Sequence, residues 1–315
     1  MLKISAYQAL LIHIANLIEG KDKLTFKQRC EYVMNTNLDD LEKADTKKPY
    51  QLREAVKALN DVKQGKKVSI PVNLDATASG IQIMSIISCD RKAGELVNIS
   101  NSSIRSDIYS EMAKGLNLDR KTAKTLIMVF FYNGRRKAYD LLGDEAAVKL
   151  FKLLDKELEG PSSLLKYINK LWMSNKSEHS WTMPDGHEVI VPVESKIQIS
   201  YSNLIYSTEH RGPSEFKSSL APNFIHSLDA WICREVITNC FKRNVWVYHT
   251  HDCFYSLPSG IQAVREEYKQ ALKRLCIMDM NKMFKMVNPL AETYIPTGSK
   301  QTMLDLIEES DYLLS

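Results

Sequence analysis

Residues 245–258 have the sequence VWVYHTHDCFYSLP, in which apolar and β-prone side chains flank a single acid, Asp252, on both sides. This pattern predicts two short strands joined by a tight turn that carries the acid. A carboxylate in such a turn stands clear of the strands and is free to face a ligand. Aspartate is also a common turn former that caps its own backbone, so the hairpin alone does not establish a site.

The composition is that of a folded protein. The 315 residues are 44% hydrophobic and 25% charged, with a net charge of +4, and this length suits one large domain or two closely joined ones. The mild positive charge permits a nucleic-acid partner without demanding one. We expect no membrane span and no secretory signal, because the apolar runs are short. Six scattered cysteines without a CxxC pair argue against a structural zinc site.

A second acid follows an earlier strand pattern. Residues 69–74 (SIPVNL) predict a strand that leads to Asp75, and the small residues 76–80 (ATASG) separate it from a predicted buried helix at 81–87. The strand would carry the carboxylate to the edge of a sheet, and the small residues would let a ligand approach the backbone. The alternative is an ordinary strand-to-helix turn with an aspartate cap.

Between the two acids lies a predicted helix with cations on one face. Arg120, Lys124, Met128 and Tyr132 recur every four residues within segment 118–134, so they form one slanting row. The cations suit phosphates, and the thioether and phenol suit a base and a sugar. The alternative is a core helix whose N-terminal half is charged.

The other patterns predict a largely helical chain with short strands. A loop at 221–224 is expected to lead into a helix that carries His226 and Asp229. A hairpin is expected at 181–192, with Pro-Asp-Gly as its turn. Further helices are expected at 5–18, 25–34, 51–60, 102–115, 145–175 and 261–278, with a strand at 197–205 and an amphipathic tail at 302–315.

These three features match the layout of an enzyme that transfers nucleotidyl groups with two metal ions. They are an acid at a strand end, a helix with an Arg/Lys/Tyr row and an acid in a hairpin turn. Two carboxylates would bind a pair of Mg²⁺ ions, one of which activates a 3′-hydroxyl while the other neutralises the leaving pyrophosphate. The helix lysine would add positive charge near the leaving oxygens.

These motifs resemble those of the single-subunit DNA-dependent RNA polymerases of bacteriophages and mitochondria, which are related to the family A DNA polymerases. Residues 75–82 (DATASGIQ) resemble motif A, the row in 120–132 resembles motif B, and 251–254 (HDCF) resemble motif C. Residues 221–227 (APNFIHS) are close to the family's APNFVHS. The motifs stand in the family's order, and the resemblance runs from about residue 8 to residue 315.

The resemblance implies an α+β fold of the right-hand polymerase type, with a palm on a small antiparallel sheet and mostly helical fingers. The parts expected are an N-terminal helical part of palm and fingers (1–68), palm with motif A (69–100), fingers with motif B (101–215), and palm with motif C and a C-terminal foot (216–315).

The resemblance also implies roles at the metal site. Asp75 and Asp252 would bind two Mg²⁺ ions with help from the Ala76 carbonyl. His251 would contact the primer end.

Further roles concern the incoming nucleotide. Arg120 and Lys124, with Lys23, would hold the triphosphate. Tyr132 and His226 would select ribose by sensing the 2′-hydroxyl, because a site that hydrogen-bonds a hydroxyl leaves its own polar groups unpaired when that hydroxyl is absent.

The implied function is that of a DNA-directed RNA polymerase catalytic subunit, with a DNA template, an RNA product and ribonucleoside triphosphates as partners. Motif A begins only 74 residues into the chain, whereas the family has a large N-terminal domain and a thumb before it. We therefore expect a split, heterodimeric phage polymerase, in which a second polypeptide supplies the N-terminal and thumb parts. We expect it in the cytoplasm of an infected bacterial host, without membrane association.

Three positions depart from the family pattern. Ala76 and Asn133 replace glycines, and Cys253 replaces the serine of motif C. The change at Asn133, directly after Tyr132, is expected to alter how Tyr132 swings during translocation.

Three other functions remain open. A family A-like DNA polymerase is disfavoured by Met128, where that family has an aromatic residue, and by Asp-Cys where it has Asp-Glu. A non-catalytic, template-binding subunit is disfavoured because both acids and both helix cations are present. A metal-dependent nuclease would have no use for the Arg/Lys/Tyr row.

Overall fold

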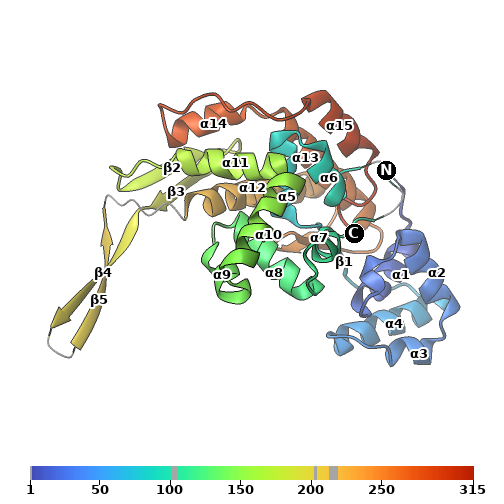
Figure 1. Cartoon of the computed structure of the whole chain (residues 1–315). Helices are drawn as coiled ribbons and strands as arrows, with labels where there is room; N and C mark the ends of the chain where they lie inside the picture. The colour runs from blue at the N-terminus through green and yellow to red at the C-terminus, as the bar shows by residue number, and fades with distance from the viewer. Residues whose placement is uncertain (1, 101, 103–104, 202–203, 213–218) are drawn as a thin grey trace.

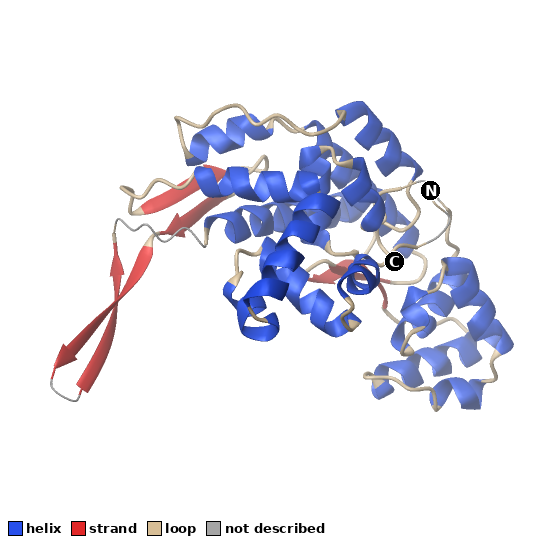
Figure 2. Ribbon diagram, in the orientation of Figure 1, coloured by secondary structure: helices blue, strands red, loops and turns tan. Residues whose placement is uncertain are grey.

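The computed structural model describes residues 2–100, 102, 105–201, 204–212 and 219–315. The fold is mostly helical with short antiparallel sheets (Figure 2), which confirms the expected α+β class. None of the helices in these ranges has the length and hydrophobicity that crossing a bilayer requires.

The N-terminal part forms a group of packed helices to one side of the molecule (Figure 1, blue). Ser5 and Thr25 each begin a helix with a capping box, in which a glutamine three residues later bonds back to the cap. The elements are α1 (Ala6–Leu17), the short 3₁₀ turn η1 (Lys21–Lys23), α2 (Phe26–Asn35), α3 (Leu38–Glu42) and α4 (Pro49–Lys63).

A buried arginine fixes the turn that carries Lys23. Arg29 has no exposed surface, and its guanidinium donates to the Asp22 carbonyl (2.6 Å), the Leu24 carbonyl (2.9 Å) and the Asn16 side chain (2.8 Å). Burial lowers the Arg29 pKa to about 10. A buried guanidinium is tolerated because its donors are paired, and this pairing holds η1 in place.

The central sheet joins distant parts of the chain. β1 (Val72–Asp75), β7 (Cys253–Ser256) and β6 (Val247–Thr250) are antiparallel in the order β1-β7-β6. The hairpin predicted around Asp252 is therefore confirmed, and β1 is the strand predicted to lead to Asp75. Val72, Leu74 and Phe254 are buried in the sheet, so the alternating pattern fixes the register: a slip of one residue would expose them.

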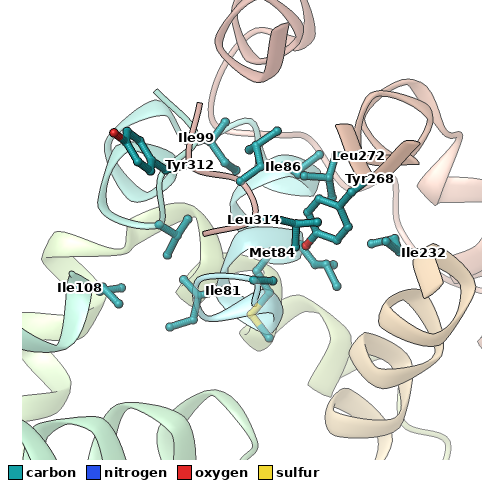
Figure 3. Close-up of a cluster of buried hydrophobic side chains, with 14 of the residues drawn as sticks. Ile81, Met84, Ile86, Ile99, Ile108, Ile232, Tyr268, Leu272, Tyr312 and Leu314 are labelled. Atoms are coloured by element: carbon teal, nitrogen blue, oxygen red, sulfur yellow. The ribbon is translucent and has the colours of Figure 1, made fainter. Parts of the chain in front are cut away.

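Three helices pack near this sheet and form much of the core. They are α5 (Ser79–Ser88), α12 (Leu220–Lys242) and α13 (Ile261–Ile277). Ile81, Met84, Ile232 and Leu272 meet in the cluster shown in Figure 3. Burying each of these side chains contributes about 1.5–3 kcal/mol. Tyr268 is also buried there and donates a hydrogen bond to Gln82 at 2.7 Å.

The remaining helices cover the core and extend from it (Figure 1). The helix expected at 145–175 is two helices with a junction at Leu158, and the one expected from 102 begins at Ile108; residues 101, 103 and 104 of that prediction lie outside the described ranges. The elements are α6 (Arg91–Leu96), α7 (Ile108–Leu116), α8 (Arg120–Phe131), α9 (Arg136–Leu142), α10 (Asp144–Glu157), α11 (Glu159–Lys170), α14 (Met280–Val287) and α15 (Lys300–Glu309).

Two hairpins complete the described fold. β2 (Glu178–Thr182) and β3 (Glu188–Pro192) form the predicted hairpin, whose turn residue Asp185 pairs with Arg234 of α12. The single strand expected at 197–205 is wrong, because β4 (Glu194–Tyr201) and β5 (Leu204–Arg211) form a second hairpin that projects from the body (Figure 1).

The loop expected at 221–224 is also wrong, since these residues lie in the first turn of α12. Pro222 suggested a break in the chain. A proline is accepted in the first turn of a helix, where its missing N–H has no intrahelical partner.

Candidate active site

The register of β1 and β7 brings the two predicted acids to neighbouring positions. Asp75 lies opposite Cys253, and the Ala76 N–H donates to the Asp252 carbonyl at 3.2 Å. On its other side, the Asp75 carbonyl accepts from the Ser315 N–H at 2.9 Å. Asp252 occupies the turn between β6 and β7, preceded by His251 with a left-handed φ of 53°. The backbone around Asp75 is therefore hydrogen-bonded on two sides, to Asp252 and to Ser315.

Burial and a neighbouring acid raise the pKa values of two carboxyl groups at the site, those of Asp75 and Asp229. Burial, followed by the charge of Asp252, raises the pKa of Asp75 to about 6, while Lys124, Lys48 and Arg105 oppose the shift. Asp75 still meets solvent in the cavity, so water screens part of this repulsion. Burial and the charge of Asp252 also raise the pKa of Asp229, on α12, to about 7, although Ser79 hydrogen-bonds its carboxylate.

A cavity of about 670 Å³ opens beside these acids. It takes residues from η1, β1, α5, α7, α8, α12 and the β6–β7 turn, so segments far apart in sequence converge on it. Every site residue predicted from the sequence lines this cavity: Lys23, Asp75, Ala76, Arg120, Lys124, Tyr132, His226, His251 and Asp252. The roles assigned to these residues remain predictions.

The α8 row forms the cationic wall of the cavity. Asp119 caps the helix by accepting from the Thr122 N–H at 3.0 Å, which sets where the row begins. Arg120 makes two hydrogen bonds to Asp107 (2.6 and 3.2 Å). Burial opposes the effect, yet these bonds and the one from Ser110 lower the pKa of Asp107 to about 2. The Tyr109 ring lies 5.6 Å from the Arg120 guanidinium carbon.

Lys124 stands one turn further along the same face. Its ammonium lies 5.5 Å from the Tyr109 ring centre, and its charge reaches Asp75. The row predicted from the four-residue spacing is therefore present as a row of cavity-lining side chains, with Tyr132 at its far end.

Tyr132 and His226 stack face to face. Their ring centres are 4.8 Å apart and the planes differ by 6°. Burial raises the pKa of Tyr132 to about 12, and burial followed by the nearby His251 lowers that of His226. Both rings are therefore neutral near pH 7, and a neutral phenol and a neutral imidazole can each donate and accept a hydrogen bond.

The surroundings of this pair fix its position. A Cβ on Gly80 would lie 2.9 Å from the Tyr132 hydroxyl, so any other residue here would require the phenol to shift. Ser227, next to His226, accepts a hydrogen bond from the buried Trp181 indole at 3.0 Å, which ties this part of α12 to the β2–β3 hairpin.

The structure adds residues to which the sequence analysis gave no role in the site. Arg105, Lys48 and Asp229 all line the cavity. Arg105 donates to the Ser315 hydroxyl at 2.8 Å, and burial lowers its pKa. Only Asp229 had a usable sequence signal, because it lies three residues after His226 on one helix face. Arg105 and Lys48 belong to no recognisable motif and reach the site through tertiary folding.

The donor set fits a Mg²⁺ ion. In the described part of the chain, no group of three or more His, Cys, Asp or Glu side chains forms a preformed metal cage. Mg²⁺ is usually bound by one or two carboxylates together with water and substrate phosphates, rather than by such a cage. Two adjacent carboxylates with repulsion between them, facing a cavity lined with cations, meet that requirement.

Comparison with known protein families gives a match to the DNA-dependent RNA polymerase model over residues 2–144 and 142–295. Curated relatives include the mitochondrial DNA-directed RNA polymerases of Mus musculus, 23% identical over 69% of this chain, and Homo sapiens, 22% identical over 84%. The chloroplastic/mitochondrial DNA-directed RNA polymerase 2 of Arabidopsis thaliana is 23% identical over 80%. The chain spans 22%, 27% and 32% of the lengths of these relatives, respectively.

The location expected from the sequence, the cytoplasm of an infected bacterial host, is wrong. The relatives are mitochondrial or chloroplast polymerases of eukaryotes rather than phage proteins. The prediction failed because it was based on motifs that line the cavity. Residues of this kind indicate the chemistry of a site and do not indicate the cellular compartment.

The raised pKa of Asp229 predicts how stability depends on pH without divalent cations. An acid with a raised folded-state pKa binds more protons when folded, so stability should fall as pH rises from about 4 to about 7. Asp229→Asn should therefore be more stable than the unchanged protein at pH 8, by about 1–2 kcal/mol after allowance for solvent screening. At pH 4 the two should be nearly equal.

Urea unfolding in EDTA at both pH values measures this difference. Asp140→Asn, on an exposed part of α9, is the matched control and should change neither value. Equal stability of Asp229→Asn and the unchanged protein at pH 8 would contradict the electrostatic account.

Proposed function

This chain belongs to the DNA-dependent RNA polymerase family, and we propose that it carries the catalytic centre that adds ribonucleotides to the 3′ end of an RNA on a DNA template. One observation carries the proposal. The two acids, the cationic face of α8 and the Tyr132–His226 pair come from separate parts of the chain, yet they line one cavity.

In this proposal Asp75, the Ala76 carbonyl and Asp252 hold two Mg²⁺ ions. When bound, such ions lower the pKa of an attacking hydroxyl and neutralise a leaving pyrophosphate. Asp75 ends β1 and Asp252 directly precedes β7, so the β1–β7 pairing and the bond from the Ala76 N–H to the Asp252 carbonyl bring the two residues together. Burial of Asp75 and, after it, the charge of Asp252 both disfavour an ionised Asp75 in the cation-free state, and a bound cation would offset both effects.

The triphosphate lies along the cationic wall in this proposal. Lys124 adds charge near the leaving oxygens, and Arg120 offers a planar guanidinium already oriented by Asp107. Lys23 is held on η1 near Asp22, at 2.6 Å. Arg105 is a further cation of the same wall.

In this proposal the sugar of the incoming nucleotide lies against the stacked rings of Tyr132 and His226. The phenol of Tyr132 and the neutral imidazole of His226 sense the 2′-hydroxyl of the incoming nucleotide by hydrogen bonding. A deoxyribonucleotide would leave these groups unpaired, which is a strong basis for discrimination. His251, in the turn that carries Asp252, contacts the primer end.

The same proposal assigns the parts of a right-hand polymerase. The β1-β7-β6 sheet with α5, α12 and α13 is the palm, and α7–α11 are the helical fingers. We further propose that a second polypeptide helps to hold the nucleic acid. The support is that the relatives named above are several times longer than the part that this chain matches.

Substitution of either metal-binding acid should abolish nucleotide addition. With a radiolabelled RNA primer on a DNA template and Mg²⁺, Asp75→Asn and Asp252→Asn should each lower the rate by about 100-fold or more. Asp140→Asn, on the exposed part of α9, should leave it unchanged. The assay is run with this chain alone and with proteins that copurify with it from its native cells. Full activity of Asp75→Asn would refute the metal role, and activity that appears only with the copurifying proteins and is unaffected by both substitutions would favour a non-catalytic, template-binding function.

Loss of the Tyr132 hydroxyl should relax sugar selection. Tyr132→Phe keeps the ring stacked on His226 but removes one hydrogen-bonding group, so the ratio of kcat/KM for ribonucleotide over deoxyribonucleotide should fall by about 10-fold or more. Addition of ribonucleotides should persist. A preference for deoxyribonucleotides in the unchanged protein would instead identify a DNA polymerase.

A further inference from the structure

The end of α8 is built differently from the glycine-containing end that the family pattern led us to expect. Tyr132 is followed by Asn133, which adopts a left-handed φ of 64°. The Gly134 N–H donates to the Val129 carbonyl (2.7 Å), and the Asn133 N–H donates to the Phe130 carbonyl (3.1 Å). These two bonds form a Schellman motif, in which asparagine is the residue after glycine best suited to the left-handed position.

Asparagine adds a side chain that glycine lacks, and here this side chain has a partner. Asn133 Nδ2 donates to Asn169 Oδ1 at 2.7 Å, and Asn169 Nδ2 donates back to Asn133 Oδ1 at 3.0 Å. The two amides thus form a closed, reciprocal pair between the end of α8 and the last turn of α11. Both side chains are half-buried, so water competes with this pair less than at the surface.

α11 is itself fixed to the helix that follows Asp75. A Cβ on Gly160 would lie 2.4 Å from the Ser88 hydroxyl, so α11 and the end of α5 approach closely. The Gly160 N–H also donates to the Asp90 carboxylate at 2.8 Å. α11 packs against α12 as well. α11 therefore supports both α5 and α12, the two helices that surround Tyr132.

Those two helices carry the neighbours of Tyr132. Gly80, beside its hydroxyl, is on α5, and His226, under its ring, is on α12. The residue directly after Tyr132 is tied to α11 through the amide pair. The position of the phenol is thus set from both sides by one connected unit.

We propose that the Asn133–Asn169 amide pair is a positioning device that holds Tyr132 on His226 and sets how strongly the cavity distinguishes ribose from deoxyribose. This inference rests on the proposed function. Asn133 and Asn169 act through Tyr132 and not by contact with the nucleotide. Loss of the pair frees Tyr132 to leave the stacked position, which weakens the selection of ribose and leaves the metal-binding acids in place.

Two substitutions remove the pair with little effect on the backbone. Asn133→Gly keeps the left-handed conformation at no steric cost, and Asn169→Ala places a good helix former in α11. Each should lower the preference for ribonucleotide by about threefold to tenfold, since two hydrogen bonds of modest net value are lost. Because both remove the same interaction, the double variant should show no greater loss than either single variant.

Further variants separate positioning from general structure. Asn133→Asp accepts from Asn169 but cannot donate back, so its preference should be intermediate. Asn244→Gly is the matched control: Asn244 ends α12 in the same left-handed motif (φ 56°), away from the cavity, and its replacement should leave the preference unchanged. Thermal unfolding establishes that each variant is folded.

The preference is measured on the full chain in two ways, by incorporation from ATP against dATP and by equilibrium binding of the same two nucleotides with Mg²⁺. Loss of preference in both pair-removing variants supports the inference. An unchanged preference in those variants, equal binding of ATP and dATP by the unchanged protein, or an equal loss in Asn244→Gly would overturn it. Binding that responds as expected in a protein that adds no nucleotide, either alone or with the proteins that copurify with it, would support the pair and refute the proposed polymerase activity.

Discussion

The whole site depends on one backbone contact between strands that are far apart in the sequence. The pairing of β1 with β7, extended by the bond from the Ala76 N–H to the Asp252 carbonyl, places two acids side by side. The buried apolar residues of the same strands fix that register, because slipping by one residue would expose Val72, Leu74 and Phe254. Hydrophobic packing thus holds together two carboxylates that repel each other.

Nearby cations offset part of the repulsion between the two acids. Lys124, Lys48 and Arg105 lower the cost of bringing the charges together, yet the pKa of Asp75 stays raised. In the proposed function, an added cation and the phosphates that it brings would offset the remaining repulsion. The Tyr132–His226 pair, which also lines the cavity, is neutral and polar, which suits a sugar and not a charged group.

Much of the site could be predicted from the sequence, because several of its residues lie in short-range sequence patterns. A four-residue spacing placed Arg120, Lys124 and Tyr132 on one face, and alternation around Asp252 gave the hairpin. Long-range partners left no such pattern, so Arg105 and Lys48 were missed although they line the cavity. Local signals also misled: Pro222 suggested a loop but lies in the first turn of α12, and the strand expected at 197–205 is split between the two strands of a hairpin.

The central claim is that Asp75 and Asp252 form a cation-binding pair at the centre of this cavity. Mn²⁺ replaces Mg²⁺ at sites with oxygen ligands and is directly visible by anomalous X-ray scattering. In crystals of this protein soaked with Mn²⁺ and a ribonucleoside triphosphate, the account predicts an anomalous peak in contact with both carboxylates and with the phosphates. A triphosphate bound along α8 with no peak at Asp75 and Asp252, or a peak only elsewhere on the protein, would contradict it.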